Sequence, residues 1–214
     1  MTVLHETIMK NLLGKAAVES NQILLVVGDN PASPAAKIHP LIRRNDDWVM
    51  AFKPINAAAG KNGFASSGKK REGDGMTPSG LYPLEFAFGY APQICTKMEY
   101  RQTTGDDIWV DDVNSVQYNT WVRKADLKAA SYEEMRRTDK LYEYGIVIGY
   151  NRNPVVKGHG SAIFFHVWEG EGTSTAGCIA MAEEDILALL GWLDPSQKPM
   201  ALIRTVETIK IMMK

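Results

Sequence analysis

The sequence is poor in the residues that build disulfide scaffolds and metal sites. It has only two cysteines, Cys95 and Cys178, and four histidines in 214 residues. Two cysteines allow one bridge on paper but not a disulfide framework. There is no Cys-x-x-Cys pair, and the histidines are too scattered for the ligand spacing of a zinc site. These shortages exclude a disulfide-rich or zinc-finger type of protein, and we expect no metal.

An excess of charge of either sign and long hydrophobic runs are also missing. Lys and Arg total 24 against 25 for Asp and Glu, a net charge of −1, which argues against a nucleic-acid-binding protein or a protein of anionic membrane surfaces. The basic run 69–71 is too short to alter this and reads as a solvated loop. No apolar run reaches the roughly 20 residues that span a bilayer. The first residues lack the basic-then-apolar order of a secretory signal. Either the chain stays in the cytoplasm, or a signal was removed, or the true start lies upstream.

What the sequence does contain is an ordinary globular composition with many short strand-like runs. It is 45% hydrophobic and 23% charged, which suffices for a core of useful size. We expect an N-terminal arm of uncertain structure over 1–19 and a single domain over 20–214, mainly β with flanking helices (α+β). The expected strands are apolar, β-branched or aromatic runs; they cover 23–27, 48–52, 108–112, 117–122, 144–150, 161–167 and 201–203.

Two further segments favour helices, and one favours a long loop. Residues 126–137 look helical, with Ser131 and Glu134 at the spacing of a capping box. After Cys178, apolar residues recur with helical spacing and an acidic stretch precedes them; the apolar positions are Ile186, Leu189, Leu190 and Leu193. Residues 57–80 are rich in glycine, serine and lysine and read as a long loop, which in compact domains is often functional.

The most informative feature is a histidine followed twelve residues later by a cysteine. His166 closes an apolar run, and Cys178 follows a turn of small residues. An imidazole that takes the thiol proton creates a nucleophile for acyl transfer. Cys178 precedes a predicted helix, whose N-terminus would lower the thiol pKa. Gly177 can present its backbone N–H to an oxyanion. A buried cysteine that is only a small hydrophobe and a structural histidine are the alternative, and a metal site of these two residues has too few ligands.

Residues 158–181 resemble the catalytic segment of the L,D-transpeptidase (YkuD-type) family. The family pattern is a histidine, a variable loop and Ser/Thr-x-Gly-Cys; here it is matched by His166, the loop 167–173 and Ser174-Thr175-Ala176-Gly177-Cys178. Upstream, 77–82 (Thr-Pro-Ser-Gly-Leu-Tyr) is similar to the family's Thr-Pro-x-Gly-x-Tyr segment. The resemblance covers 23–181. It implies a β-sandwich catalytic domain without cofactors, in a divergent branch of the family.

The resemblance implies a two-step reaction on peptidoglycan stem peptides. Cys178 attacks the carbonyl of the L-centre of a diamino acid in a stem tetrapeptide, His166 handles the protons, and N–H groups near Gly177 hold the oxyanion. D-Alanine leaves, and the amine of a neighbouring stem forms a 3–3 cross-link. Hydrolysis of the same bond, as by an L,D-carboxypeptidase, and a non-catalytic peptidoglycan-binding module remain alternatives. The family implies the cell envelope, periplasm or exterior, as the location. The oligomeric state is left open.

Two positions depart from the family pattern. The common motif has His where this chain has Ala176, and many members have Arg where it has Ala180. The substrate-binding candidates are therefore drawn from the motif itself and from a segment just upstream; they are Ser174, Thr175, Tyr150, Asn151 and Arg152. Trp168 and Glu169 are candidates for the wall of the substrate groove. We expect His159 at the rim of the site and Cys95 in a structural role.

Overall fold

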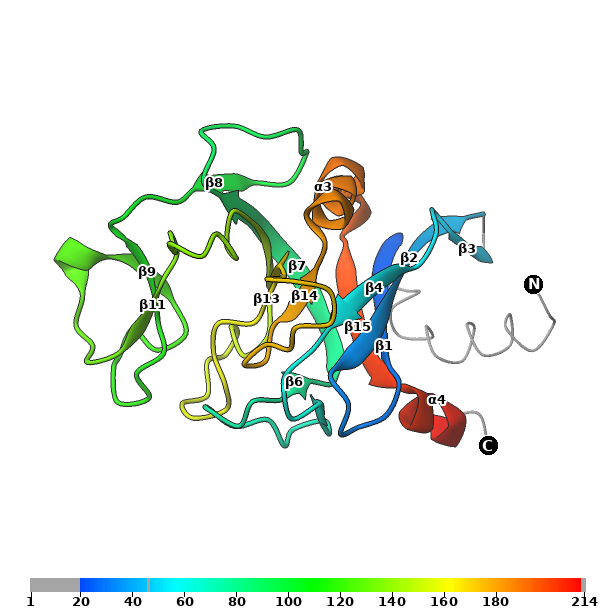
Figure 1. Ribbon diagram of the computed structural model, residues 1–214, viewed down its shortest axis with the longest axis horizontal. Helices are drawn as coiled ribbons and strands as arrows, with labels where there is room; N and C mark the ends of the chain where they lie inside the picture. The colour runs from blue at the N-terminus through cyan, green and yellow to red at the C-terminus, as the bar shows by residue number, and fades with distance from the viewer. Residues whose placement is uncertain (1–19, 46, 213–214) are drawn as a thin grey trace.

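The computed structural model describes residues 20–45 and 47–212, and the predicted arm over 1–19 lies outside them. The fold is built on a ten-stranded sheet (Figure 1). Its strands are β1 Gln22–Gly28, β2 Ala35–Arg44, β3 Asp47–Met50, β4 Ile55–Ala58, β7 Gly80–Gly89, β8 Tyr100–Gln102, β12 Tyr144–Ile148, β13 Phe164–Val167, β14 Ile179–Met181 and β15 Met200–Thr205.

This sheet closes on itself. Its order is β1-β15-β7-β12-β13-β14-β4-β2-β3, and β1 pairs with β2 as well as with β15. Strands β1 to β2 along this path therefore form a ring, which removes exposed edges. The prediction of a mainly β fold with a few helices is confirmed. The predicted β-sandwich is not, because the continuous pairing gives a barrel-like sheet.

The core lies inside this curved sheet, and helix α3 (Glu183–Trp192) packs against it. The four apolar residues that predicted this helix are all fully buried, and α3 contacts β12 and β13. The helix ends before Leu193, and a short 3₁₀ helix, η2 Pro195–Gln197, begins after Asp194. A second helix, α4 Val206–Met212, follows β15. No helix in the described part of the chain is long and apolar enough to cross a membrane.

A smaller three-stranded sheet forms a lobe beside the main sheet. Its strands are β9 Asp107–Val110, β10 Trp121–Arg123 and β11 Tyr132–Glu134, in the order β10-β9-β11. Trp109 of β9 is buried against Phe164 of β13, with ring centroids 4.9 Å apart in an edge-to-face arrangement. This aromatic packing attaches the lobe to the strand that carries His166, so the lobe can contribute side chains to the same site.

The helix predicted over 126–137 is wrong. Only the 3₁₀ turn η1 Lys124–Asp126 is helical there, and β11 pairs antiparallel with β9. The Ser131 hydroxyl donates to Asp111 Oδ1 at 2.5 Å rather than capping a helix, and the Asp112 carboxylate accepts the Ala130 N–H. Strand pairing and these long-range contacts override a weak helical pattern.

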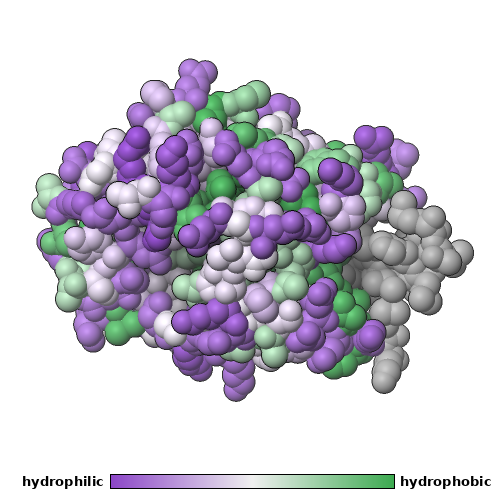
Figure 2. Space-filling model, in the orientation of Figure 1, coloured by the Kyte–Doolittle hydropathy of each residue, from purple (hydrophilic) through white to green (hydrophobic). Residues whose placement is uncertain are grey.

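The other predicted strands are present, with shifted ends. Segments 23–27, 144–150, 161–167 and 201–203 correspond to β1, β12, β13 and β15, whereas only 121–122 of the 117–122 run is strand, in β10. Strand β2 was not predicted, although its buried and exposed residues largely alternate. The predicted loop 57–80 contains the short pair β5 Phe64–Ala65 and β6 Thr77–Pro78. The face of the molecule in Figure 2 is largely hydrophilic, with apolar residues in small scattered groups.

Candidate active site

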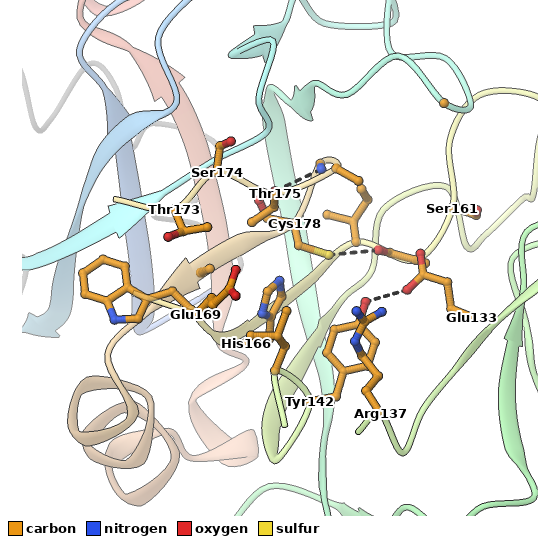
Figure 3. Close-up of a pocket in the computed structure, with 18 of the residues that line it drawn as sticks. Glu133, Arg137, Tyr142, Ser161, His166, Glu169, Thr173, Ser174, Thr175 and Cys178 are labelled. Carbon is orange, nitrogen blue, oxygen red and sulfur yellow. Dashed lines mark hydrogen bonds between the residues drawn. The ribbon is translucent and has the colours of Figure 1, made fainter. Parts of the chain in front are cut away.

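One pocket of about 410 Å³ contains both residues of the predicted Cys–His pair. Its walls come from three separate parts of the chain: the segment 161–180, the loop 70–73, and the segment 133–142 that follows the lobe (Figure 3). Its lining residues are Lys70, Glu72, Gly73, Glu133, Arg137, Leu141, Tyr142, Ser161, Ala162, Ile163, His166, Trp168, Glu169, Thr173, Ser174, Thr175, Ala176, Gly177, Cys178 and Ala180.

Cys178 lies directly before β14, with 8% of its surface exposed. Its Sγ donates to the Ala162 carbonyl at 3.1 Å and accepts the Phe164 N–H at 3.3 Å. Strand β14 separates the residue from α3, so the predicted position at a helix N-terminus is wrong. Burial raises the pKa of the Cys178 thiol to about 12, and the charge of Glu133 acts in the same direction. The Cys178 side chain is therefore a neutral thiol at neutral pH.

His166 projects from β13, and a backbone carbonyl orients it. Its Nδ1 lies 2.7 Å from the Val167 carbonyl oxygen. Because a carbonyl can only accept, Nδ1 carries the proton, and Nε2 is the unprotonated nitrogen that can act as a base. The ring stacks edge-to-face on Tyr142, with centroids 5.3 Å apart. Burial lowers the pKa of His166 to about 4, although the Val167 carbonyl opposes the shift. The imidazole is thus neutral at neutral pH.

The thiol and the imidazole share the pocket but do not bond to each other at rest. His166 is on β13, and Cys178 directly precedes the adjacent parallel strand β14, in which Ala180 pairs with His166. Figure 3 shows both side chains at the pocket, with the sulfur turned to the Ala162 carbonyl. Among the described residues no hydrogen bond joins Sγ to the ring. Catalytic contacts are often long without substrate, so a rotation of the thiol has to precede proton transfer.

The turn before the nucleophile is built around Gly177. Its φ of +152° disfavours other residues, and a Cβ there would lie 2.9 Å from the Met76 carbonyl oxygen. The Gly177 N–H donates to Thr175 Oγ1 at 3.0 Å, and this hydroxyl donates to the Cys178 carbonyl at 2.7 Å. The N–H predicted to meet an oxyanion is therefore already engaged. The Cys178 N–H makes no hydrogen bond within the described residues, which makes it the better oxyanion donor.

Thr77, from the upstream Thr-Pro-Ser-Gly segment, supports the same turn from beneath. It is fully buried, and its Oγ1 accepts the Gly60 N–H at 2.8 Å. The hydroxyl donates to the Gly177 carbonyl at 2.9 Å, with the Cys178 carbonyl 3.3 Å away. The two segments that carry the family resemblance, about 100 residues apart, thus form one structural unit around the nucleophile.

The predicted substrate-binding residues divide into two groups. Ser174 and Thr175 line the pocket, and so do the groove candidates Trp168 and Glu169. The other three candidates are outside the lining and make structural contacts. Tyr150 donates to the His159 carbonyl at 2.5 Å, and Asn151 donates to the carbonyls of Val156 and Gly160.

Arg152, the third of these, is held by groups outside the pocket. Its guanidinium bonds to Glu85 Oε2 at 3.1 Å and to the Asn119 carbonyl at 2.6 Å, and it lies over the Trp109 ring. The structure therefore does not bring 150–152 to the pocket.

Several pocket residues were not anticipated. Glu133 accepts a hydrogen bond from the Tyr142 hydroxyl at 2.5 Å, and burial raises the pKa of its carboxyl. Arg137 lies 5.2 Å over the Tyr142 ring. The loop 70–73 contributes Lys70 and Glu72. No local sequence signal marks Glu133 and Arg137, because only the packing of the lobe on β13 brings them to the pocket. Lys70 and Glu72 belong to the long loop 57–80, whose composition indicated a functional segment but no particular residue.

No metal centre accompanies this pocket. Within residues 20–45 and 47–212 there is no group of three or more His, Cys, Asp or Glu side chains that could hold a metal ion. Both cysteines are free thiols; Cys95 is exposed and Cys178 is buried.

Comparison with known proteins places these features in a family. A model of the YkuD family, described as the L,D-transpeptidase catalytic domain, matches residues 42–206. Comparisons with curated proteins and with solved structures gave no match. The matched region includes the supporting Thr77, the base candidate His166 and the nucleophile candidate Cys178. The chain belongs to the YkuD family of L,D-transpeptidase catalytic domains.

Proposed function

We propose that this protein is an L,D-transpeptidase that uses Cys178 as nucleophile and His166 as base to form 3–3 cross-links between peptidoglycan stem peptides. The observation that carries the proposal is the shared pocket, which both the Cys178 thiol and the His166 imidazole line. The family membership supports acyl transfer on peptidoglycan.

In the first step Cys178 Sγ attacks the carbonyl carbon of the L-centre at stem position three, and its proton passes to His166 Nε2. The Val167 carbonyl, 2.7 Å from Nδ1, stabilises the imidazolium that forms. The Cys178 N–H donates to the developing oxyanion. His166 then gives the proton to the departing amide nitrogen, the C–N bond breaks, and D-alanine leaves a thioester on Cys178.

In the second step an amine from a neighbouring stem attacks the thioester. His166 takes a proton from this amine, the new amide forms, and Cys178 leaves and is reprotonated. A second pocket of about 240 Å³ supports an acceptor approach, because Trp168 lines both pockets. Asp29, Glu171 and Lys37 are the charged side chains that line this second pocket.

Hydrolysis of the same thioester is the alternative, and it would make the protein an L,D-carboxypeptidase. A transpeptidase would act in the cell envelope, where stems are cross-linked. A carboxypeptidase could act on free stem peptides in the cytoplasm. The two enzymes share the acylation step and differ only in whether an amine or water attacks.

The test is incubation with disaccharide tetrapeptides and mass spectrometry of the products. We expect D-alanine release together with a cross-linked dimer, and neither product with the Cys178→Ala variant. Tripeptide without dimer would instead support the carboxypeptidase. Absence of D-alanine release, or release that survives Cys178→Ala, would contradict both. Carbapenem labelling provides a separate check, because a stoichiometric adduct on Cys178 excludes a non-catalytic binding module.

A further inference from the structure

The pocket contains two cationic side chains, and their surroundings differ. Lys70 has 4% of its side chain exposed, and its Nζ is held by Asp74 Oδ1 at 2.5 Å and by the Arg71 carbonyl at 2.9 Å. Arg137 has 36% of its side chain exposed. Its position among the pocket residues makes it the more accessible cation for a substrate.

Arg137 has hydrogen-bonding capacity that the protein does not use. Its Nε and Nη2 atoms donate to the carboxylate of Asp139. Its Nη1 atom makes no hydrogen bond with any residue that the structure describes. A guanidinium has five N–H donors in a fixed fork, so Nη1 offers two donors to an anion.

Arg137 packs on the aromatic ring that also contacts His166. The guanidinium carbon lies 5.2 Å over the Tyr142 ring, and the same ring packs against His166. In Figure 3 the side chains of Glu133, Arg137 and Tyr142 converge on the side of the pocket next to Cys178. Arg137 also lowers the pKa of both His166 and Cys178 by its charge, which agrees with this proximity.

The acidic groups around Arg137 leave room for a second anion. Asp139 occupies only one edge of the guanidinium. Burial raises the pKa of the Glu133 carboxyl, which accepts the Tyr142 hydroxyl, so its negative charge is disfavoured. Glu72 and Glu169 also line the pocket, but the Glu72 carboxylate already accepts hydrogen bonds from the Tyr118 and Ser161 hydroxyls. Ala176 and Ala180 contribute no charge. Arg137 is thus the group best suited to bind a substrate anion there.

We propose that Arg137 is a specificity-determining residue that binds a carboxylate of the stem peptide through Nη1 and so positions the reacting carbonyl at Cys178. This proposal rests on the proposed function. The carboxylate can come from two sources: the C-terminus of the leaving residue, or a carboxylate elsewhere in the stem. Both present the same planar group to a guanidinium.

Equilibrium binding of tetrapeptide to Cys178→Ala protein tests the proposal without requiring turnover. Adding Arg137→Met should weaken binding of the native tetrapeptide by about 10- to 100-fold, as expected for a lost charged hydrogen bond. Arg137→Lys should keep part of the affinity. The matched control is Arg136→Met, because Arg136 stacks on Tyr90 outside the pocket; this change should leave affinity unaltered. Thermal unfolding verifies that each variant is folded.

Amidated peptides identify the source of the carboxylate. One peptide has its C-terminus amidated, and another has its remaining carboxylates amidated. Amidation of the carboxylate that Arg137 binds should weaken peptide binding. For that amidated peptide, Arg137→Met should cause no further loss of affinity. Unchanged affinity in Arg137→Met, an equal effect of Arg137→Met on every peptide, or no binding of any peptide would overturn the proposal. If binding depends on Arg137 but the wild type releases no D-alanine, the proposed function fails and the Arg137 site stands.

Discussion

At the scale of single residues, the Cys178 thiol and the His166 imidazole are both neutral at neutral pH. Burial raises the pKa of Cys178 to about 12 and lowers that of His166 to about 4. Between these values the pair is a thiol and an imidazole rather than a thiolate and an imidazolium. The thiol bonds to the Ala162 carbonyl at 3.1 Å, so in the proposed mechanism the thiol loses its proton during the attack on substrate and not before it.

This protonation state predicts the pH profile of alkylation by iodoacetamide. A thiolate reacts and a thiol does not, so the rate at Cys178 should rise about tenfold per pH unit between pH 5 and 8, with no plateau. The measurement should use a Cys95→Ser background, because Cys95 is an exposed free thiol. The profile should be unchanged in His166→Ala. A plateau below pH 8 that vanishes in His166→Ala would show a resting ion pair and contradict the account.

The sequence predicts the reacting residues better than their environment. His166 and Cys178 were identified from a motif, and the structure brings both to one pocket. The motif could not show that the Gly177 N–H is taken by Thr175, because this contact depends on a local turn geometry. Nor could it place 150–152, whose polar side chains suit substrate binding and structural bonding equally well.

At the scale of elements, the nucleophile turn depends on a support from a distant loop. Thr77 Oγ1 is the partner of the Gly60 N–H and of the Gly177 carbonyl. Thr77 is fully buried, so no water can replace its hydroxyl as the partner of these backbone groups. The position of Cys178 is therefore coupled to the loop that carries Thr77.

Two substitutions of Thr77 should distinguish the contribution of its side-chain shape from that of its hydroxyl hydrogen bonds. Thr77→Val keeps the shape but leaves a buried donor and acceptors without partners, which should lower the free energy of unfolding by about 1 to 3 kcal/mol. D-Alanine release should fall as well, because the turn loses its support. Thr77→Ser keeps the hydroxyl and should retain most of both quantities. Chemical denaturation and the release assay provide the measurements; equal behaviour of the two variants would refute the hydrogen-bonding role.

The elements themselves were predictable where the hydrophobic pattern was strong. Helix α3 has a fully buried apolar face, and β1 is a continuous apolar run. The failure at 126–137 has a specific cause, because β11 forms only by pairing with β9, more than 20 residues earlier. Local propensity contains no information about such a partner.

At the scale of the whole molecule, the closed sheet sets the position of the site. Because β13 pairs in parallel with β14, Cys178, which directly precedes β14, lies near His166 of β13. The lobe of β9 to β11 then packs against β13 and leads into the segment that contributes Arg137 and Tyr142. Motifs could identify the family, but only this packing defines which charges face the substrate.

The central claim is that Cys178 forms a thioester with the stem peptide, and the mass of the intact protein tests it most directly. Wild-type protein mixed with a stem tetrapeptide and quenched in acid should gain the mass of the tetrapeptide less D-alanine, on the peptide fragment that contains Cys178. Cys178→Ala should gain nothing, and His166→Ala should acylate much more slowly. D-Alanine release with no adduct on Cys178, or an adduct on another residue, would contradict the account.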